Sequence, residues 1–543
     1  MAGRIDLSLD RIRKLLTYLP RYTRPTCHIA GTNGKGSVSA LLSFILSASS
    51  YTVGRFNSPH LVEIYDCITI DNKPVLPSVY ESTRKRVEAA DKERHLNCSN
   101  FELLTAAALV IFEEAGVDIV VLEVGMGGRL DATNAIPDEC VLISALTAVD
   151  LDHQAFLGAN VREIAREKAA IARPGKPFVL GPQNPVHSAE VEAVVREVTG
   201  SVGANLILAV LPTSRDWGST LDGQPACPTS LNPSAFRCED GLQPFSQPVS
   251  FALPGMPDNP DFVHALLPLQ GEHQLENLGT AVTMISMLLE SDHPLDFKHR
   301  INPNAISQGI QSTHWRGRLS FHTITLPFSD TTGASIPQQE FVVLTDGAHN
   351  PASSARLAAF VEGTLAAVTK PPEPPSPALV APAPMEPPGP PISGGEAPCR
   401  TITLTYVLAL SHSPPKTPEQ TLTPLLALDP ESLGSYVRVV TRVALVRFSP
   451  PAGMPWVTSE KPSELGAVVR SLLPDADIWT PEREDEDVGA SQLRAALNWA
   501  AEMQLRDAES EECDSEGLVV IAGSLYLVAD FYRVLNETGR REA

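Results

Sequence analysis

Residues 28–37 read HIAGTNGKGS and join a short apolar run to a helix through a glycine-rich turn. Cys27 to Ala30 suit a buried strand, and Val38 to Leu46 carry apolar residues at helical spacing. Glycines let backbone N–H groups turn toward a ligand, and a helix N-terminus adds partial positive charge. Lys35 can then reach terminal phosphates, and the Ser37 hydroxyl can bind Mg²⁺. The pattern predicts a phosphate-binding loop, with a tight turn carrying a surface lysine as the alternative. One glycine separates these two residues, which departs from the usual Walker spacing.

Strand-like and helix-like segments alternate around this loop. Val117 to Val124 and Val141 to Leu146 are nearly continuous apolar runs, as in the central strands of a parallel sheet. This βαβ alternation predicts an α/β fold: a P-loop-type ATP-binding domain with a mostly parallel, doubly wound sheet that binds ligands at the carboxyl ends of its strands. The other predicted elements here are a strand at Thr52 to Phe56, a hairpin from Ile68 through Asp71-Asn72, and helices at Leu7 to Leu19, Val79 to Lys92, Phe101 to Ala115, Ile164 to Ala172 and Leu275 to Leu289.

A second α/β pattern follows Gly317. We predict two domains, residues 1–317 and residues 318–543, the second being a smaller Rossmann-like domain. Its predicted strands are Leu319 to Leu326, Phe341 to Leu344, Ile402 to Leu410, Val437 to Phe448 and Leu518 to Ala522. Its predicted helices are Ala352 to Ala367, a segment near Gln492 to Met503 and a segment near Leu525 to Leu535.

Two segments interrupt these patterns. Residues 212–260 are rich in Pro, Ser and Gly and show little periodicity, so we predict an irregular loop or insertion. Residues 371–398 are dominated by proline and carry little charge, which predicts a disordered surface insertion.

Composition narrows the class of protein. The 543 residues carry a formal net charge of −22, which argues against non-specific nucleic-acid binding and leaves an anionic small-molecule substrate open. The eight cysteines are scattered without metal-like spacing, as expected for reduced thiols in the cytoplasm. We find no apolar run of membrane-spanning length and no signal core in Met1 to Asp10, so we expect no membrane association; a mitochondrial pool stays open.

Nine short motifs occur in an order that resembles the folate branch of the Mur ligase family, the dihydrofolate synthases and folylpolyglutamate synthases. They cover the first two-thirds of the chain densely and the rest sparsely. The motifs are AGTNGKGS (30–37), SPHL (58–61), FELLT (101–105), EVGMGGRLDATN (123–134), DH (152–153), EKA (167–169), GEHQ (271–274), WRGR (315–318) and DGAHNP (346–351).

The resemblance implies a reaction and a set of ligands. MgATP phosphorylates the carboxylate of a pteroate or folate, and the amine of L-glutamate then attacks the acyl phosphate. The implied cofactors are ATP, two Mg²⁺ ions and, as an open question, K⁺. The implied partners are these small molecules alone, bound by a monomer without nucleic acid or membrane.

The resemblance also implies metal ligands. Ser37, Glu123 and His153 would hold one Mg²⁺, and Lys168 would help to hold a second when it is carbamylated. A lone carboxylate such as Glu123 at the end of a buried strand is otherwise costly, and carboxylate oxygens suit Mg²⁺. From the residues alone, the alternative for His153 is a capping or core histidine, and the periodicity around Lys168 favours an exposed helix lysine.

The remaining implied site residues contact nucleotide, phosphate or glutamate. Arg318, at the domain junction, can neutralise phosphate, and Asp346, after an apolar strand, can accept hydrogen bonds from ribose hydroxyls. The alternative for Asp346 is a role in an ordinary turn. The alternative for Asn277 is the ordinary polarity of a helix N-terminus. The expected ATP-binding set is Thr32, Asn33, Gly34, Lys35, Gly36, Ser37, Asn277, Arg318 and Asp346, and the expected catalytic residues are Lys35, Lys168 and His349.

The acceptor loop departs from the family pattern. By resemblance Ser58, Pro59 and His60 fold over the pterin, but Tyr65-Asp66-Cys67 stands where an Arg-Glu-Arg triplet is common, and Thr69 replaces a frequent arginine. A poorly basic loop favours dihydropteroate, which has one carboxylate, over a folate that already carries glutamate.

Two further segments, residues 448–457 and 5–12, resemble the fungal dihydrofolate synthases. We therefore predict dihydrofolate synthesis, with folylpolyglutamate synthase or a bifunctional enzyme as the alternative. A non-catalytic nucleotide-binding scaffold is a third hypothesis, motivated by the proline-rich insertion and the altered loop. A P-loop GTPase or kinase is disfavoured, because we find no base-specific or phosphoacceptor motif.

Overall fold

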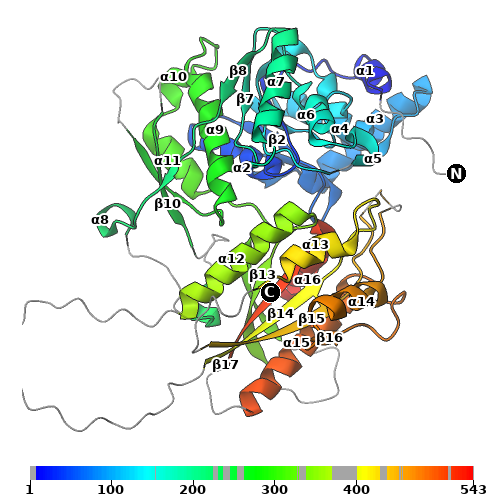
Figure 1. The fold of residues 1–543 in the computed structure, drawn as a ribbon. Helices are drawn as coiled ribbons and strands as arrows, with labels where there is room; N and C mark the ends of the chain where they lie inside the picture. The colour runs from blue at the N-terminus through cyan, green and yellow to red at the C-terminus, as the bar shows by residue number, and fades with distance from the viewer. Residues whose placement is uncertain are drawn as a thin grey trace, which may run out of the picture.

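The computed structural model describes residues 8–152, 154–223, 230–236, 245–253, 262–326, 328, 338–369, 400–428, 437–451, 454, 457–510 and 515–541. Two large α/β units, each built around one sheet, lie against each other, and a small third sheet lies at the edge of the first unit (Figure 1). Within these residues, no helix combines the length and the apolar character needed to cross a membrane.

The first sheet has eight strands in the order β4-β3-β2-β5-β1-β6-β7-β8. All of its pairs are parallel except β2–β3 and β3–β4, and the β3–β4 pair is the predicted hairpin. The predicted mostly parallel sheet is therefore confirmed. The strands are β1 (Thr26–Ala30), β2 (Val53–Phe56), β3 (Ile68–Ile70), β4 (Lys73–Pro74), β5 (Ile119–Glu123), β6 (Val141–Leu146), β7 (Pro177–Leu180) and β8 (Asn205–Leu208).

Helices cover both faces of this sheet. One face packs against α2 (Lys35–Ala48) and α9 (His273–Leu289), and α11 (Pro303–Gln311) packs on α2 and on β11 (Val263–Leu267). The other packs against α4 (Asn100–Ala115), α6 (Val161–Ala169) and α7 (Ser188–Val202). This double covering explains the continuous apolar character of the central strands. The remaining helices here are α1 (Asp10–Leu16), α3 (Pro77–Arg94) and the short α5 (Gln154–Leu157), α8 (Ser219–Asp222) and α10 (Phe297–Arg300).

Local signals place the helix starts. Ser99 caps α4: its hydroxyl accepts the backbone N–H of Glu102 at 3.2 Å, and the Glu102 carboxylate accepts the N–H of Ser99 at 2.7 Å. This reciprocal pair satisfies two donors that the first turn would leave without partners. Asn160 caps α6 through the N–H of Glu163.

The prediction that residues 212–260 are irregular was wrong in part. β9 (Thr213–Ser214) and β10 (Gln247–Phe251) pair with β11 (Val263–Leu267) in a three-stranded antiparallel sheet. Val249 and Phe251 alternate with less buried neighbours and join the core below α9. β9 has only two residues, and the alternation around Val249 is short and flanked by prolines, so the local signal for these strands was weak. The predicted proline-rich insertion, residues 371–398, lies outside the described residues.

The second large sheet has the order β12-β13-β17-β14-β15-β16, parallel except for β12–β13. α12 (Pro351–Thr369), α13 (Pro418–Leu425) and α14 (Pro462–Leu472) cover one face, and α15 (Ala490–Ser510) and α16 (Leu525–Arg541) cover the other. This is the predicted Rossmann-like arrangement. The strands are β12 (Ser320–Leu326), β13 (Gln339–Thr345), β14 (Arg400–Leu408), β15 (Val437–Leu445), β16 (Asp477–Trp479) and β17 (Ser515–Ala522).

Candidate active site

The glycine-rich loop connects the carboxyl end of β1 to the first turn of α2. Gly34 precedes the helix with φ 90°, a conformation that favours glycine. A Cβ atom on Gly34 would lie 2.2 Å from Oδ1 of Asn277, and one on Gly36 would lie 2.6 Å from Cζ2 of Trp315. Glycine is therefore required at both positions by close packing against later parts of the chain.

Lys35 lies over its own loop. Its Nζ atom donates hydrogen bonds to the backbone oxygens of Gly31 at 3.1 Å and Thr32 at 3.2 Å, and it lies 3.9 Å from Oε1 of Glu123. The ammonium group thus lies over the glycine-rich loop with one carboxylate beside it. Its predicted contact with phosphate stays a prediction.

Glu123 ends β5 and is buried. Asn57 donates from Nδ2 to its Oε2 atom at 2.5 Å. Burial raises the pKa of Glu123, while Lys35 and Asn57 oppose this shift. The sequence analysis did not identify Asn57, because an Asn before Ser-Pro carries no distinctive local signal.

The structure describes some, but not all, of the predicted metal ligands. Ser37 is buried in the first turn of α2, and His153 lies outside the described residues. No cluster of three or more His, Cys, Asp or Glu side chains suited to a metal occurs in the part of the chain that the structure describes. The donors that are present, a hydroxyl and a buried carboxylate beside a phosphate loop, fit the oxygen preference of Mg²⁺.

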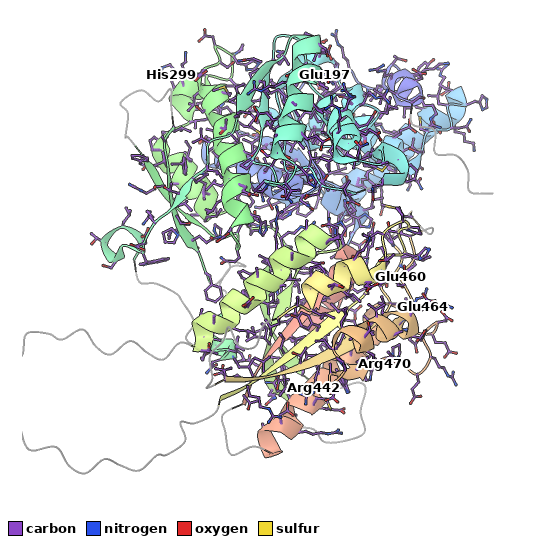
Figure 2. The ribbon with its side chains drawn as sticks, in the orientation of Figure 1. Glu197, His299, Arg442, Glu460, Glu464 and Arg470 are labelled. Carbon is purple, nitrogen blue, oxygen red and sulfur yellow. The ribbon has the colours of Figure 1, made fainter. Side chains whose placement is uncertain are left out.

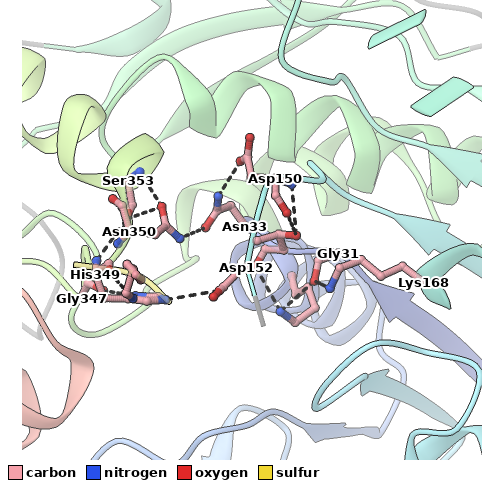
Figure 3. Close-up of polar contacts among 12 residues, drawn as sticks. Gly31, Asn33, Asp150, Asp152, Lys168, Gly347, His349, Asn350 and Ser353 are labelled. Carbon is pink, nitrogen blue, oxygen red and sulfur yellow. Dashed lines mark hydrogen bonds and ion pairs between the residues drawn. The ribbon is translucent and has the colours of Figure 1, made fainter. Parts of the chain in front are cut away.

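Lys168 reaches the same loop from α6. It is buried, and its Nζ atom donates to the backbone oxygen of Gly31 at 2.8 Å (Figure 3). Burial, reinforced by the charge of Lys35, lowers the pKa of Lys168 to about 7. The reading of Lys168 as an exposed helix lysine is therefore wrong.

Arg318 and Asp346 lie together at the start of the second sheet. Both carboxylate oxygens of Asp346 accept backbone N–H groups, from Leu319 at 2.9 Å and from Ala348 at 2.8 Å. A Cβ on Gly347 would lie 2.0 Å from Nη1 of Arg318, so the guanidinium covers this turn. The carboxylate thus holds the turn in shape, and its predicted contact with ribose stays a prediction.

The two large sheets meet at the phosphate loop. Asn350 donates from Nδ2 to Oδ1 of Asn33 at 3.4 Å, and Asn33 donates from Nδ2 to Oδ2 of Asp150 at 2.8 Å (Figure 3). Nearby, Nε2 of His349 lies 3.8 Å from Oδ2 of Asp152. The DGAHNP segment of the second sheet therefore contacts both the loop and the strand end beside it.

A lysine that the sequence analysis did not identify supports His349. Lys416 donates from Nζ to the backbone oxygen of His349 at 2.6 Å. Burial lowers the pKa of Lys416, and Asp152 opposes this shift. Lys416 follows two prolines in a loop after β14, where no sequence signal pointed to a role.

Asn277 lies on the first turns of α9 and is buried. It donates from Nδ2 to Oε1 of Gln274 at 2.8 Å, and its Oδ1 atom is the one that excludes a side chain at Gly34. The structure therefore brings this predicted nucleotide-binding residue to the phosphate loop.

The acceptor loop follows β2. His60 is buried, which lowers its pKa. Asp66 accepts the backbone N–H groups of Val62 at 3.0 Å and Glu63 at 2.9 Å, so the residue that departs from the family pattern shapes the loop. Arg533 of α16 donates to the backbone oxygen of Val62 at 3.2 Å and brings a positive charge to the loop from the other sheet.

Comparisons with known proteins agree with this architecture. Residues 400–534 match the family model described as dihydrofolate synthetase, C-terminal domain. The chain is 30% identical over 534 residues to dihydrofolate synthetase of Saccharomyces cerevisiae, covering 98% of both chains. The chain belongs to the dihydrofolate synthetase family. Within this folate branch of the Mur ligases it is an ATP-dependent ligase, as the sequence analysis predicted.

Other similar proteins agree with this placement. The chain is 26% identical over 542 residues to a probable dihydrofolate synthetase of Schizosaccharomyces pombe, covering 98% of this chain and 99% of that one. Mycobacterium tuberculosis folylpolyglutamate synthase complexed with ADP has a similar fold, with a TM-score of 0.66 at 23% identity, covering 98% of this chain and 95% of that one. Escherichia coli FolC in complex with DHPP and ADP has a TM-score of 0.60 at 22% identity, covering 100% and 95%. The predicted fold class is confirmed.

Proposed function

We propose that this chain joins L-glutamate to 7,8-dihydropteroate, consuming ATP and giving dihydrofolate, ADP and phosphate. The similarity along 98% of both chains to the yeast dihydrofolate synthetase carries the proposal. The meeting of the glycine-rich loop with the DGAHNP segment supports it, because such a ligase must bring ATP, the acceptor acid and an amine to one place.

ATP lies between the two sheets in this proposal. The loop N–H groups and the ammonium of Lys35 bind the terminal phosphates, and Arg318 neutralises phosphate charge from the second sheet. Asn277 and Asp346 orient the nucleoside. The residues proposed to contact ATP are Thr32, Asn33, Gly34, Lys35, Gly36, Ser37, Asn277, Arg318 and Asp346.

Ser37 and Glu123 hold Mg²⁺ in this proposal, and His153 is proposed as a further ligand. A bound Mg²⁺ supplies charge neutralisation for the transferring phosphoryl group. Lys168, once carbamylated, contributes an anionic oxygen for a second ion. K⁺ binding stays a prediction without a contact to support it.

The bond changes balance without any other reactant. A carboxylate oxygen of dihydropteroate attacks the γ-phosphorus and ADP leaves, which gives an acyl phosphate. The amine of glutamate then attacks the acyl carbon, loses a proton and displaces phosphate. His349, held by Lys416 and facing Asp152, is proposed to position glutamate or phosphate at this second step. Ser58, Pro59 and His60 are proposed to cover the pterin.

All proposed substrate contacts come from one chain, so we propose that the monomer is the active form. Light scattering coupled to gel filtration at assay concentration tests this. A stable dimer whose separated subunits are inactive contradicts it.

The decisive assay offers purified protein MgATP and L-glutamate with either dihydropteroate or tetrahydrofolate. We expect ADP release and a glutamylated product with dihydropteroate alone, and neither product when glutamate is omitted. Product with tetrahydrofolate alone reverses the choice in favour of folylpolyglutamate synthase, and product with both identifies a bifunctional enzyme. No product with either acceptor favours the non-catalytic scaffold.

A further inference from the structure

Arg55 is a buried cation in the middle of β2. Its side chain is 5% exposed, and its Nε and Nη1 atoms have no hydrogen-bond partner among the residues that the structure describes. Burial lowers its pKa only to about 10, with Glu123 opposing the shift, so the guanidinium stays charged at neutral pH. Buried donors without acceptors are costly, which indicates that this arginine serves something other than packing.

A second group without a partner faces the same side of the sheet. In the antiparallel β2–β3 pair, Arg55 stands directly opposite Thr69. Residues directly opposite share a face, with Cβ atoms about 5 Å apart. The Oγ1 atom of Thr69 is buried and also has no hydrogen-bond partner in the described chain. Two N–H donors and one hydroxyl therefore gather at one place.

This place adjoins the reaction centre. Arg55 pairs in register with Val121 of β5, so Glu123, two residues further on, points from the same face. The guanidinium stacks on the ring of Trp315, with 5.0 Å between Cζ and the ring centroid. That ring also lies against Gly36 of the phosphate loop. An anion bound at Arg55 would therefore lie between the predicted metal ligand and the phosphate loop.

We propose that Arg55, together with Thr69, binds the reacting carboxyl group of the acceptor substrate. The inference rests on the proposed function and extends it to a residue outside the family motifs. Thr69 stands where an arginine is frequent in the resembling enzymes, and Arg55 supplies the cation from the opposite strand. The neighbouring loop carries the acidic Asp66 and few positive charges. In this proposal, Arg55 of β2 supplies the positive charge for the substrate that the loop lacks.

The test measures binding directly. Dihydropteroate is titrated calorimetrically into protein saturated with ADP, and ATP is titrated separately. We expect Arg55→Met to weaken dihydropteroate binding about 10- to 100-fold, as for loss of charge-assisted hydrogen bonds, and to leave ATP binding within about twofold. The double variant Arg55→Met, Thr69→Arg moves the cation across the strand pair and should recover most of the affinity.

Two outcomes overturn the inference. Unchanged dihydropteroate affinity in Arg55→Met makes the arginine a structural cation. Loss of ATP affinity with dihydropteroate affinity intact assigns the guanidinium to the γ-phosphate instead. If Arg55→Met does not fold, Arg55→Lys and Thr69→Val replace it, and wild-type affinity in both contradicts the proposal.

Arg442 provides a matched control. It is an equally buried arginine in β15 of the second sheet, paired with Asp507 at 2.5 Å and Asp477 at 3.2 Å (Figure 2). Arg442→Met should lower the melting temperature without changing either affinity. Turnover of the wild type tests the proposed function separately. Should the wild type use tetrahydrofolate alone, the same variants are titrated with that acceptor, and unchanged affinity there overturns the inference.

Discussion

Lys168 donates a hydrogen bond to the backbone oxygen of Gly31 at 2.8 Å, across 137 residues of sequence. Lys35 donates to the same oxygen at 3.1 Å. Two ammonium groups thus share one acceptor at the bottom of the phosphate loop. Each ammonium charge disfavours the other. Burial of Lys168, together with the charge of Lys35, lowers the pKa of Lys168 to about 7.

The lowered pKa predicts that Lys168 reacts with carbon dioxide. About half of the amine is neutral near pH 7, whereas an ordinary lysine is less than about a thousandth neutral there. The neutral amine attacks CO₂ and releases a proton, which leaves a carbamate. With ¹³C-bicarbonate at pH 8 we expect a carbamate carbon resonance in the wild type that is missing from Lys168→Arg.

We expect Lys168→Arg to lose most of its turnover as well. The exposed residue Lys461 provides a control, since Lys461→Arg should keep both the resonance and the activity. A fully active wild type without any carbamate resonance would show that the unmodified amine is sufficient.

Lys35→Ala should remove most turnover. The ammonium lies 3.9 Å from Glu123, and we propose that it binds the terminal phosphates. Loss of one preorganised donor to a developing charge costs roughly 100- to 1,000-fold in rate. Steady-state assays with dihydropteroate measure this, and Lys14→Ala on the exposed side of α1 is the control. Turnover near that of the wild type would refute the role given to Lys35.

Lys416→Met tests the support of His349. The Nζ atom of Lys416 donates to the backbone oxygen of His349 at 2.6 Å, and hydrogen bonds from charged donors contribute about 1.5–3 kcal/mol. Without this bond the backbone at His349 is held less firmly, so we expect kcat/KM for glutamate to fall about 10- to 100-fold. ATP affinity should change by less than about twofold, because the hydrogen bond of Lys416 goes to His349, which is outside the proposed ATP-binding set. Equal losses for both ligands would indicate a general loss of the second sheet's structure; Lys461→Met is the control.

His28 predicts a pH dependence of stability. It is fully buried in β1, where Nε2 lies 2.9 Å from Oγ1 of Thr133, and burial lowers its pKa to about 3. Between about pH 3 and 6.5 the unfolded chain binds a proton that the folded chain does not. Above about pH 6.5 neither state binds this proton, so the histidine does not make the free energy of unfolding depend on pH. As the pH falls from about 6.5 toward 3, the free energy of unfolding decreases by at most about 1.4 kcal/mol per pH unit.

Urea unfolding of His28→Gln between pH 4 and 7 measures this. We expect its free energy of unfolding to fall less steeply with decreasing pH than that of the wild type. The difference between the two slopes should correspond to about one bound proton. His95→Gln, at an exposed helix end, should keep the wild-type slope. Parallel pH profiles for His28→Gln and the wild type would contradict the assignment.

The local signals of the chain predicted the strand and the helix on either side of the glycine-rich loop. β1, the glycine turn and α2 were readable because alternation, helical spacing and glycine requirements are set by neighbours in sequence. The same reasoning failed at β10, whose partners are residues 213–214 and 263–267. Residues 177–208, which form β7, α7 and β8, carried no motif and were covered by no prediction.

The contacts across strands and loops had no such signal. Asn57 at Glu123, Lys416 at His349 and Arg55 opposite Thr69 are pairings across strands or loops. A single sequence records the residue types at these positions and not which of them meet. The roles assigned by resemblance to Ser58, Pro59 and His60, and to His153, stay predictions.

The sequence by itself determined the fold class, the glycine-rich turn between β1 and α2, and the family, because these depend on short patterns in a particular order. Only the tertiary structure decided that Lys168 is buried against Gly31, that Asn33 meets Asn350, and that Arg55 lies beside Trp315 without a hydrogen-bond partner in the described chain. The physical reason is that burial and charge coupling depend on which segments pack together, and these residues lie on different strands and helices.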